Sequence, residues 1–250
     1  MALVTTAATI LKTYEYSETS KILRLLTRDD GLCSVIAKGA RRPKSRFGGV
    51  LEPFTDGVAT YYAKQGRDLH TLSGFELRKE RQSLGREIVR YGGAALVTEI
   101  ALRFASGSRD LRLFRGLRRA LDRLVEEPGD VEGAALAEGW RLIACLGFSP
   151  NLDRCPVCGR PALEGDTSHF DLAAGGLRCG RCGPRRPGRA IRALSRSARR
   201  ELVDLARDGG GNGALRTGRV QRALLRDFIV YHLPDDRPLN SFRFLDGQLE

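Results

Sequence analysis

The sequence predicts an α+β protein in which a strand-rich N-terminal part precedes a helical part. Short apolar runs with the two-residue period of strands fill the first 80 residues. From Ser83 onward, apolar residues recur every three or four positions, which is the period of an amphipathic helix. Two pairs of cysteines interrupt the helical part. We therefore expect two domains, residues 1–80 and 81–250, with an insertion in the second at about 151–189.

The first domain is expected to be a small barrel. Its clearest turn is Asp30-Gly31, because Asp-Gly between two apolar runs is typical of a β-hairpin. Five short strands with no long helix between them favour a small five-stranded barrel, of which the OB-fold is one example. The expected strands are residues 9–16, 22–27, 32–37, 57–63 and 69–77.

The second domain is expected to be all helical outside the insertion. Asp110 has the side chain of an N-cap, and Pro128-Gly129 ends the helix that it begins. A glycine-rich stretch at 209–213 separates the last two helices, and residues 239–250 are expected to form a short tail. The expected helices are about 83–105, 111–127, 131–146, 195–207 and 216–233.

The insertion carries the strongest chemical signal, two C-x-x-C pairs separated by 20 residues: Cys155, Cys158, Cys179 and Cys182. This spacing allows four thiolates to surround one tetrahedral zinc ion. Two disulfides are the alternative, and the lack of an export signal disfavours them. Four cysteine ligands leave no open position for water or substrate, so the expected zinc site is structural.

A basic segment follows the third expected strand. Residues 38–46 hold five positive charges and no acid, and an aromatic residue follows directly: Lys38, Arg41, Arg42, Lys44, Arg46 and Phe47. A basic loop on a small barrel is a common way to follow the phosphate backbone of a single strand. The alternative is a solvated turn that only keeps the protein soluble. We expect a nucleic-acid-binding loop.

Two further groups of arginines lie in the helical part. One group has no acid between its members: Arg178, Arg181, Arg185, Arg186, Arg189, Arg192, Arg196, Arg199 and Arg200. The other forms a stripe opposite the apolar face of the second helix: Arg112, Arg115, Arg119 and Arg123. The first group supports a nucleic-acid partner. The stripe is weaker support, because Asp110 and Asp122 lie close to it.

The overall charge agrees with such a partner. The chain has 42 basic and 30 acidic residues, a formal net charge of +12, and only six of the bases are lysine. Arginine forks match phosphate geometry and stack on bases, although a coding bias also raises arginine content. A hydrophobic fraction of 42% is ordinary for a folded protein.

Several function classes are disfavoured by missing patterns. No apolar run is long enough to span a membrane, and residues 1–6 lack a secretory signal, so we expect a cytoplasmic protein. The sequence has no G-x-x-x-x-G-K-[ST], no G-x-S-x-G and no H-E-x-x-H. We expect no enzymatic activity, no small-molecule substrate and no membrane partner.

The order of these features resembles the RecO family of bacterial recombination mediators and DNA repair proteins, over essentially the whole chain. The telling stretches are Lys-Gly-Ala-Arg at 38–41, Leu-Glu-Pro-Phe at 51–54, Gly-Phe-Ser-Pro at 147–150 before the cysteine module, and Leu-Asn-Ser-Phe-Arg-Phe-Leu at 239–245. The resemblance implies an OB-fold domain and a helical domain with an inserted zinc finger.

The resemblance also implies a function in DNA repair and homologous recombination. Such a protein binds single- and double-stranded DNA, anneals complementary strands, and loads the recombinase onto DNA covered by single-strand-binding protein, with RecR as partner. It would work in the bacterial cytoplasm, at the nucleoid. The family's DNA contacts on the barrel carry over here to Lys38, Arg41, Arg42, Lys44 and Arg46.

Two other classes remain as alternatives. Some DNA-repair glycosylases carry a four-cysteine finger on a helical domain, but they use an N-terminal Pro-Glu, whereas this chain begins Met1-Ala2-Leu3. Release of damaged bases would identify that class. A zinc-ribbon nucleic-acid-binding factor would instead prefer a defined duplex site or RNA.

Overall fold

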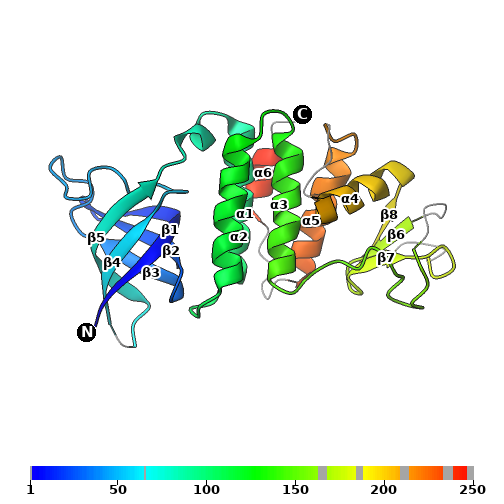
Figure 1. Ribbon diagram of the computed structural model, residues 1–250, viewed down its shortest axis with the longest axis horizontal. Helices are drawn as coiled ribbons and strands as arrows, with labels where there is room; N and C mark the ends of the chain where they lie inside the picture. The colour runs from blue at the N-terminus through cyan, green and yellow to red at the C-terminus, as the bar shows by residue number, and fades with distance from the viewer. Residues whose placement is uncertain are drawn as a thin grey trace.

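The molecule is elongated, with a barrel at one end, helices in the middle and a small sheet at the other end (Figure 1). A computed structural model of the chain describes residues 2–64, 66–162, 168–183, 188–208, 214–232 and 239–246. Among these residues, no helix is long and apolar enough to cross a membrane.

The N-terminal part is a closed barrel of five strands in the order β1-β2-β3-β5-β4. β3 and β5 pair in parallel, and the other neighbours pair antiparallel. The predicted five-stranded OB-fold barrel is therefore confirmed. The strands are β1 Ala2–Tyr16, β2 Ser20–Thr27, β3 Gly31–Ala37, β4 Asp56–Ala63 and β5 Leu69–Lys79.

β1 begins seven residues earlier than the sequence predicts. Its first half pairs with β4, from Ala2 opposite Ala63 to Thr9 opposite Asp56, and its second half pairs with β2. The two pairings overlap at Ala8 and Thr9, and a register shift between Ile10 and Lys12 lies within the pairing with β2. One long strand therefore closes the barrel by pairing with different neighbours along its length.

The predicted Asp-Gly turn joins β2 to β3 and contacts the helical domain. Gly31 has a φ of +67°, and a Cβ there would lie 2.2 Å from the carbonyl oxygen of Ser108. Next to it, the Leu32 N–H donates a 2.9 Å hydrogen bond to the Ser106 carbonyl. Glycine is thus required both by the backbone conformation and by the close approach of the two domains.

The five expected helices are present, with two additions. Asp110 accepts hydrogen bonds from the N–H groups of Arg112 and Leu113, as an N-cap does. The predicted tail contains a further short helix, and a 3₁₀ turn precedes the first long helix. The elements are η1 Gln82–Gly85, α1 Ile88–Phe104, α2 Leu111–Glu126, α3 Val131–Cys145, α4 Arg196–Asp208, α5 Gly218–His232 and α6 Ser241–Asp246. Residues 209–213 lie outside the described part.

α1 is the central helix and packs against α2, α3 and α6. It is apolar on most sides, which is typical of a helix enclosed by others. Close packing uses a glycine, because a Cβ at Gly93 would lie 2.9 Å from the Cβ of Ala135 on α3. α6 is held to α1 by Glu99, whose carboxylate accepts hydrogen bonds from the N–H groups of Asn240 and Ser241.

A buried ionic network joins the barrel to the helices. Asp56 on β4 accepts 2.8 Å hydrogen bonds from Arg81 and from Arg118 of α2, and Arg81 also contacts Asp122 of α2 at 2.7 Å. The Arg81 and Asp56 side chains are only 1% and 2% exposed. Burial acts to raise the pKa of Asp56, but hydrogen bonding and attraction to Arg81 hold it below the ordinary value. The network therefore favours the ionised carboxylate and fixes the two domains together.

A small three-stranded sheet lies beyond the helices (Figure 1). Two of its strands lie in the predicted insertion, and the third begins after the predicted end at about residue 189, where only helices are expected. Its strands are antiparallel, in the order β7-β6-β8. The bounds are β6 Ser168–Asp171, β7 Gly176–Arg178 and β8 Ile191–Leu194. Phe170 and Leu177 are buried and belong to the same core as the helices, so the sheet is packed on the helical domain.

Candidate metal centre and nucleic-acid interface

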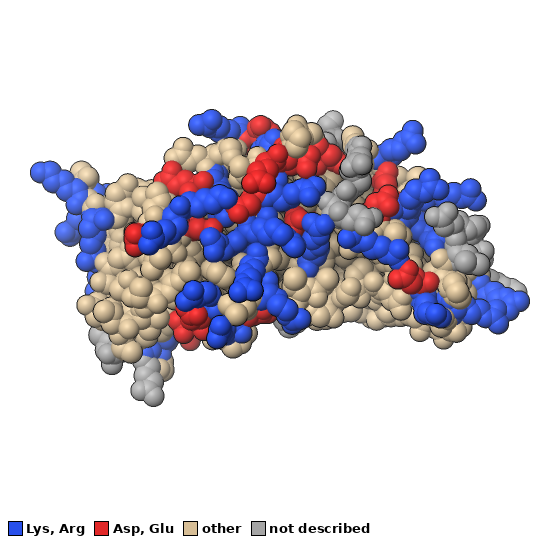
Figure 2. All heavy atoms as spheres, viewed as in Figure 1, with Lys and Arg blue, Asp and Glu red and all other residues tan. Residues whose placement is uncertain are grey.

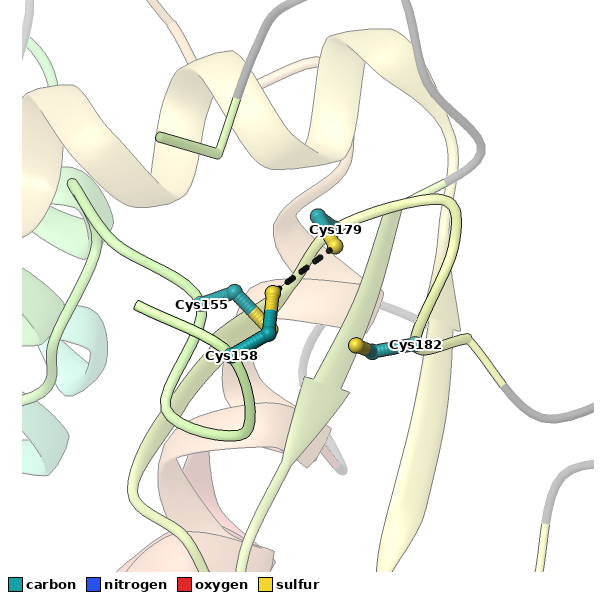
Figure 3. A group of neighbouring side chains, drawn as sticks. All are labelled: Cys155, Cys158, Cys179 and Cys182. Carbon is teal, nitrogen blue, oxygen red and sulfur yellow. Dashed lines mark hydrogen bonds between the residues drawn. The ribbon is translucent and has the colours of Figure 1, made fainter. Parts of the chain in front are cut away.

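The structure brings the four predicted cysteine ligands together. Cys155 and Cys158 come from the loop before β6, and Cys179 and Cys182 follow β7 directly. Their sulfur atoms all lie within 4.8 Å of one another, and the Cys158 and Cys179 Sγ atoms are 3.6 Å apart (Figure 3). All four are free cysteines, so the structure does not contain the alternative disulfides.

Two tight turns place these sulfurs. The Gly159 N–H donates to the Cys155 carbonyl at 2.8 Å, and Gly159 has a φ of +71°. In the second loop, the N–H groups of Cys182 and Gly183 both donate to the Cys179 carbonyl at 3.0 Å. Each C-x-x-C pair is therefore folded back so that both of its thiols face the same point.

The donor set fits a tetrahedral metal ion. Zn–S bonds of about 2.3 Å place neighbouring sulfurs about 3.8 Å apart, close to the observed contact. Burial acts to raise the pKa of Cys155, but backbone hydrogen bonds, with Cys179 the largest contributor, lower it to about 6. The pKa of Cys182 rises to about 12, chiefly because its hydrogen bond to Cys158 favours the thiol. The two pKa values shift in opposite directions because hydrogen bonds favour the thiolate at Cys155 and the thiol at Cys182, and a divalent cation would allow all four sulfurs to ionise.

The predicted basic loop lies between β3 and β4 and is held in a defined shape. Successive turns are closed by hydrogen bonds from Arg42 N–H to the Gly39 carbonyl at 3.2 Å and from Ser45 N–H to the Arg42 carbonyl at 3.0 Å. Arg41 N–H donates to the Thr19 carbonyl at 2.9 Å and so ties the loop to the β1–β2 turn. The loop therefore presents its cations from a fixed backbone.

Most cations of the loop have no acidic neighbour. Lys38, Arg42 and Lys44 are exposed, and no described carboxylate lies within ion-pair distance of them. Arg41 contacts Glu15 at 3.2 Å, and Arg46 donates to the Leu72 carbonyl at 3.2 Å. Figure 2 shows blue side chains at the outer left edge of the barrel without adjoining red, whereas the two colours are interleaved over the helices.

Phe47 differs from the expectation of an exposed aromatic face. It is only 3% exposed and belongs to the barrel core. The Arg46 guanidinium lies 4.9 Å from the centre of its ring. Phe47 is buried because it packs with Leu51 into the barrel core, and this packing attaches the loop to the barrel. Phe47 is thus a structural residue and does not offer its ring to a base.

Four of the helical arginines are engaged by carboxylates, and six others are exposed. Arg119 of the predicted stripe contacts Glu138 at 3.4 Å, and Arg123 contacts Glu127 at 3.5 Å. In the longer group, Arg178 pairs with Asp171, Arg192 pairs with Asp227 and Arg199 donates to the Ala162 carbonyl. Arg112, Arg115, Arg181, Arg189, Arg196 and Arg200 are exposed, while Arg185 and Arg186 lie outside the described residues. Glu138 and Asp227 lie 19 and 35 residues from the arginines that they contact, so these two pairings are not visible in the local sequence.

An OB-fold barrel with an exposed basic loop, joined to helices that carry a four-cysteine centre, defines a nucleic-acid-binding protein of the OB-fold class. The chain belongs to the Recombination protein O family. The family's N-terminal model matches residues 1–81 and its C-terminal model matches residues 85–240. The resemblance seen in the sequence is confirmed, and with it a role in DNA repair and recombination.

Full-length relatives agree with this assignment. A protein of Rubrobacter xylanophilus named DNA repair protein RecO is 33% identical over 241 residues, which cover 94% of each chain. Proteins of the same name from Bifidobacterium adolescentis and Salinibacter ruber are 32% and 33% identical, over 95% and 100% of this chain and 96% and 95% of their own. The similarity therefore extends across both domains.

Proposed function

We propose that this protein is a recombination mediator that binds single- and double-stranded DNA through its basic loop, anneals complementary strands and helps to load the recombinase. The observation that supports this most directly is the set of loop cations without acidic neighbours, above all Lys38, Arg42 and Lys44. Cations that are not neutralised within the protein remain available to phosphates.

The proposed annealing is electrostatic. Two single strands repel through their phosphates, and a surface that binds both lowers this repulsion without covalent chemistry. Each phosphate contact on a single strand contributes about −0.7 to the salt slope, so five contacts give about −3.5. A fourfold rise in salt then weakens binding about a hundredfold. Such a process needs no ATP.

The proposed partners follow from family membership and charge. Loading takes place on DNA covered by single-strand-binding protein, with RecR as co-mediator. A net charge of +12 favours encounter with the acidic tail of single-strand-binding protein. The site of action is the bacterial cytoplasm, at the nucleoid.

The proposed metal is one structural zinc ion per chain, held by Cys155, Cys158, Cys179 and Cys182. It would stabilise the insertion, because small modules of this kind gain much of their folding free energy from the metal. Elemental analysis of the purified protein tests this directly, and one zinc per chain is the expected result.

The function is tested by the rate at which the protein anneals complementary oligonucleotides coated with single-strand-binding protein, without ATP, at low and moderate salt. Acceleration that falls with salt is expected. A second series includes RecR, which separates a strict need for the partner from absence of activity. Failure to accelerate annealing in both series would contradict the proposal.

A further inference from the structure

A cleft of about 520 Å³ lies between the barrel and the helical domain. One wall consists of Lys12 and Tyr14 on β1 with Arg24 on β2, and the other includes Tyr91 on α1 and Phe244 on α6. Its volume is in the range of small-ligand sites in proteins.

Three aromatic rings of this cleft are exposed. Tyr14, Tyr91 and Phe244 each have more than a third of their surface accessible, although residues of this size usually gain stability from burial. Tyr91 lies edge-on to Phe244, with ring centres 5.8 Å apart, and to Phe54 at the same distance. These contacts hold Tyr91 and Phe244 in place while their outer surfaces stay open.

Two cations face each other at the same place. Lys12 and Arg24 are directly paired residues of β1 and β2, an arrangement in which like charges destabilise a sheet. No described carboxylate forms an ion pair with either; Arg24 donates to the Ser34 hydroxyl at 3.0 Å, and the Lys12 ammonium lies 5.0 Å from the Tyr14 ring centre. The acid of the cleft, Glu99, already accepts two backbone hydrogen bonds at α6. The cleft therefore carries positive charge, and a bound anion would offset the repulsion between the two cations.

The cleft is adjacent to the basic loop. Arg41 of the loop contacts Glu15, the residue next to Tyr14. At its other end the loop leads into Pro53 and Phe54, which also line the cleft. The loop and the cleft are therefore joined through chain neighbours at both ends of the loop.

We propose that this cleft is a second contact for single-stranded DNA, in which unpaired bases stack on Tyr14, Tyr91 and Phe244 while phosphates meet Lys12 and Arg24. Aromatic side chains beside cations are the recurring arrangement of single-strand binders, because every base has a face that can stack. Paired bases of a duplex cannot enter, so the cleft selects single strands. The inference rests on the proposed function, because the loop delivers the strand.

The test compares two exposed tyrosines of the barrel. Tyr14→Ala removes a ring of the cleft, and Tyr62→Ala removes an exposed ring of β4 that does not line it. Affinity is measured for a short oligothymidylate and for an abasic oligonucleotide of the same length. Tyr14→Ala is expected to weaken oligothymidylate binding about fivefold to a hundredfold and to leave abasic binding unchanged. Tyr62→Ala should bind both as the wild type does, and Tyr14→Phe should retain the stacking.

A second pair of variants separates this inference from the proposed function. Lys12→Ala with Arg24→Ala is compared with alanine at Lys38, Arg42 and Lys44. If the cleft pair binds oligothymidylate as the wild type does while the loop variant loses binding, the cleft proposal is wrong and the proposed function stands. If an acidic peptide, and not DNA, depends on Lys12 and Arg24, the cleft is a peptide site and the proposal is also overturned. Loss of DNA binding in both variants supports both.

Discussion

The barrel and the helical domain carry their positive charge in different ways. On the barrel loop, Lys38, Arg42 and Lys44 have no described acid within ion-pair distance. On the helices, several arginines are held by carboxylates, as when Glu138 contacts both Arg119 and Arg141, although Arg112 and Arg115 are exposed. A count of charges therefore does not locate a phosphate-binding surface. What matters is which cations the fold leaves without a partner.

The largest expected effect concerns the far end of the helical domain. Cys179→Ser removes one of four sulfur ligands, and metal binding in such modules contributes about 10–16 kcal/mol. We expect loss of the metal and loss of amide-exchange protection in β6, β7 and β8, with protection of the barrel unchanged. Cys145→Ser, at a free cysteine outside the cluster, is the control. Unchanged protection in Cys179→Ser would contradict the metal assignment.

The connection between the two regions is the next to be tested. Asp56→Ala removes one of the two carboxylates that contact the buried Arg81 and is expected to cost about 3–5 kcal/mol in the free energy of unfolding. Because the pKa of Asp56 is lowered in the folded state, its contribution is present above about pH 3.9 and is lost as the pH falls further. Denaturation at neutral and acidic pH measures both. Asp56→Asn should lack this part of the pH dependence, and a wild-type dependence in Asp56→Asn would contradict the role of the carboxylate.

A smaller effect is expected where the β2–β3 turn meets the helices. Gly31→Ala carries the cost of a positive φ, about 1–3 kcal/mol, and in addition brings a Cβ against the Ser106 and Ser108 carbonyls. Gly66→Ala has a similar φ of +71° but open space around it, so it carries the backbone cost alone. Thermal denaturation should show Gly31→Ala as the less stable of the two. Equal stability of the two variants would mean that the close contact between Gly31 and the Ser106 and Ser108 carbonyls does not constrain the residue at this turn.

The smallest effect is expected on α2. Arg112 and Arg115 are exposed, so their replacement by alanine should change the free energy of unfolding by less than about 0.5 kcal/mol. We also expect the salt slope of DNA binding to stay the same. A salt slope less steep by about 0.7 for each residue would show that they contact phosphates. The DNA-binding surface would then include helical arginines that have no acidic partner.

Much of the fold is predictable because its signals are local. Strand alternation, the helix period, the Asp110 cap and the cysteine spacing each depend on residues close in sequence. The missed elements depend on tertiary partners: α6 is capped by Glu99, and the first half of β1 is defined by its pairing with β4. For the same reason, the burial of Phe47 and the neutralisation of Arg119 by Glu138 are not visible in the sequence.

The central claim is that the loop cations, and not positive charge in general, bind DNA. Two variants test it, each replacing five cations by alanine in a protein of net charge +12. One changes Lys38, Arg41, Arg42, Lys44 and Arg46; the other changes five arginines that are each ion-paired with an acid: Arg28, Arg78, Arg123, Arg192 and Arg207.

The measurement is the salt dependence of single-strand affinity for both variants and the wild type. The loop variant should lose about a tenfold to a hundredfold in affinity at moderate salt. Its slope should be less steep by about 2 from Lys38, Arg42 and Lys44 alone, and by about 3.5 where Arg41 and Arg46 also leave their partners to contact phosphates. The ion-paired variant should keep the wild-type slope. Equal losses of affinity in the two variants would contradict the account, because binding would then depend on net charge and not on which cations lack an acidic partner.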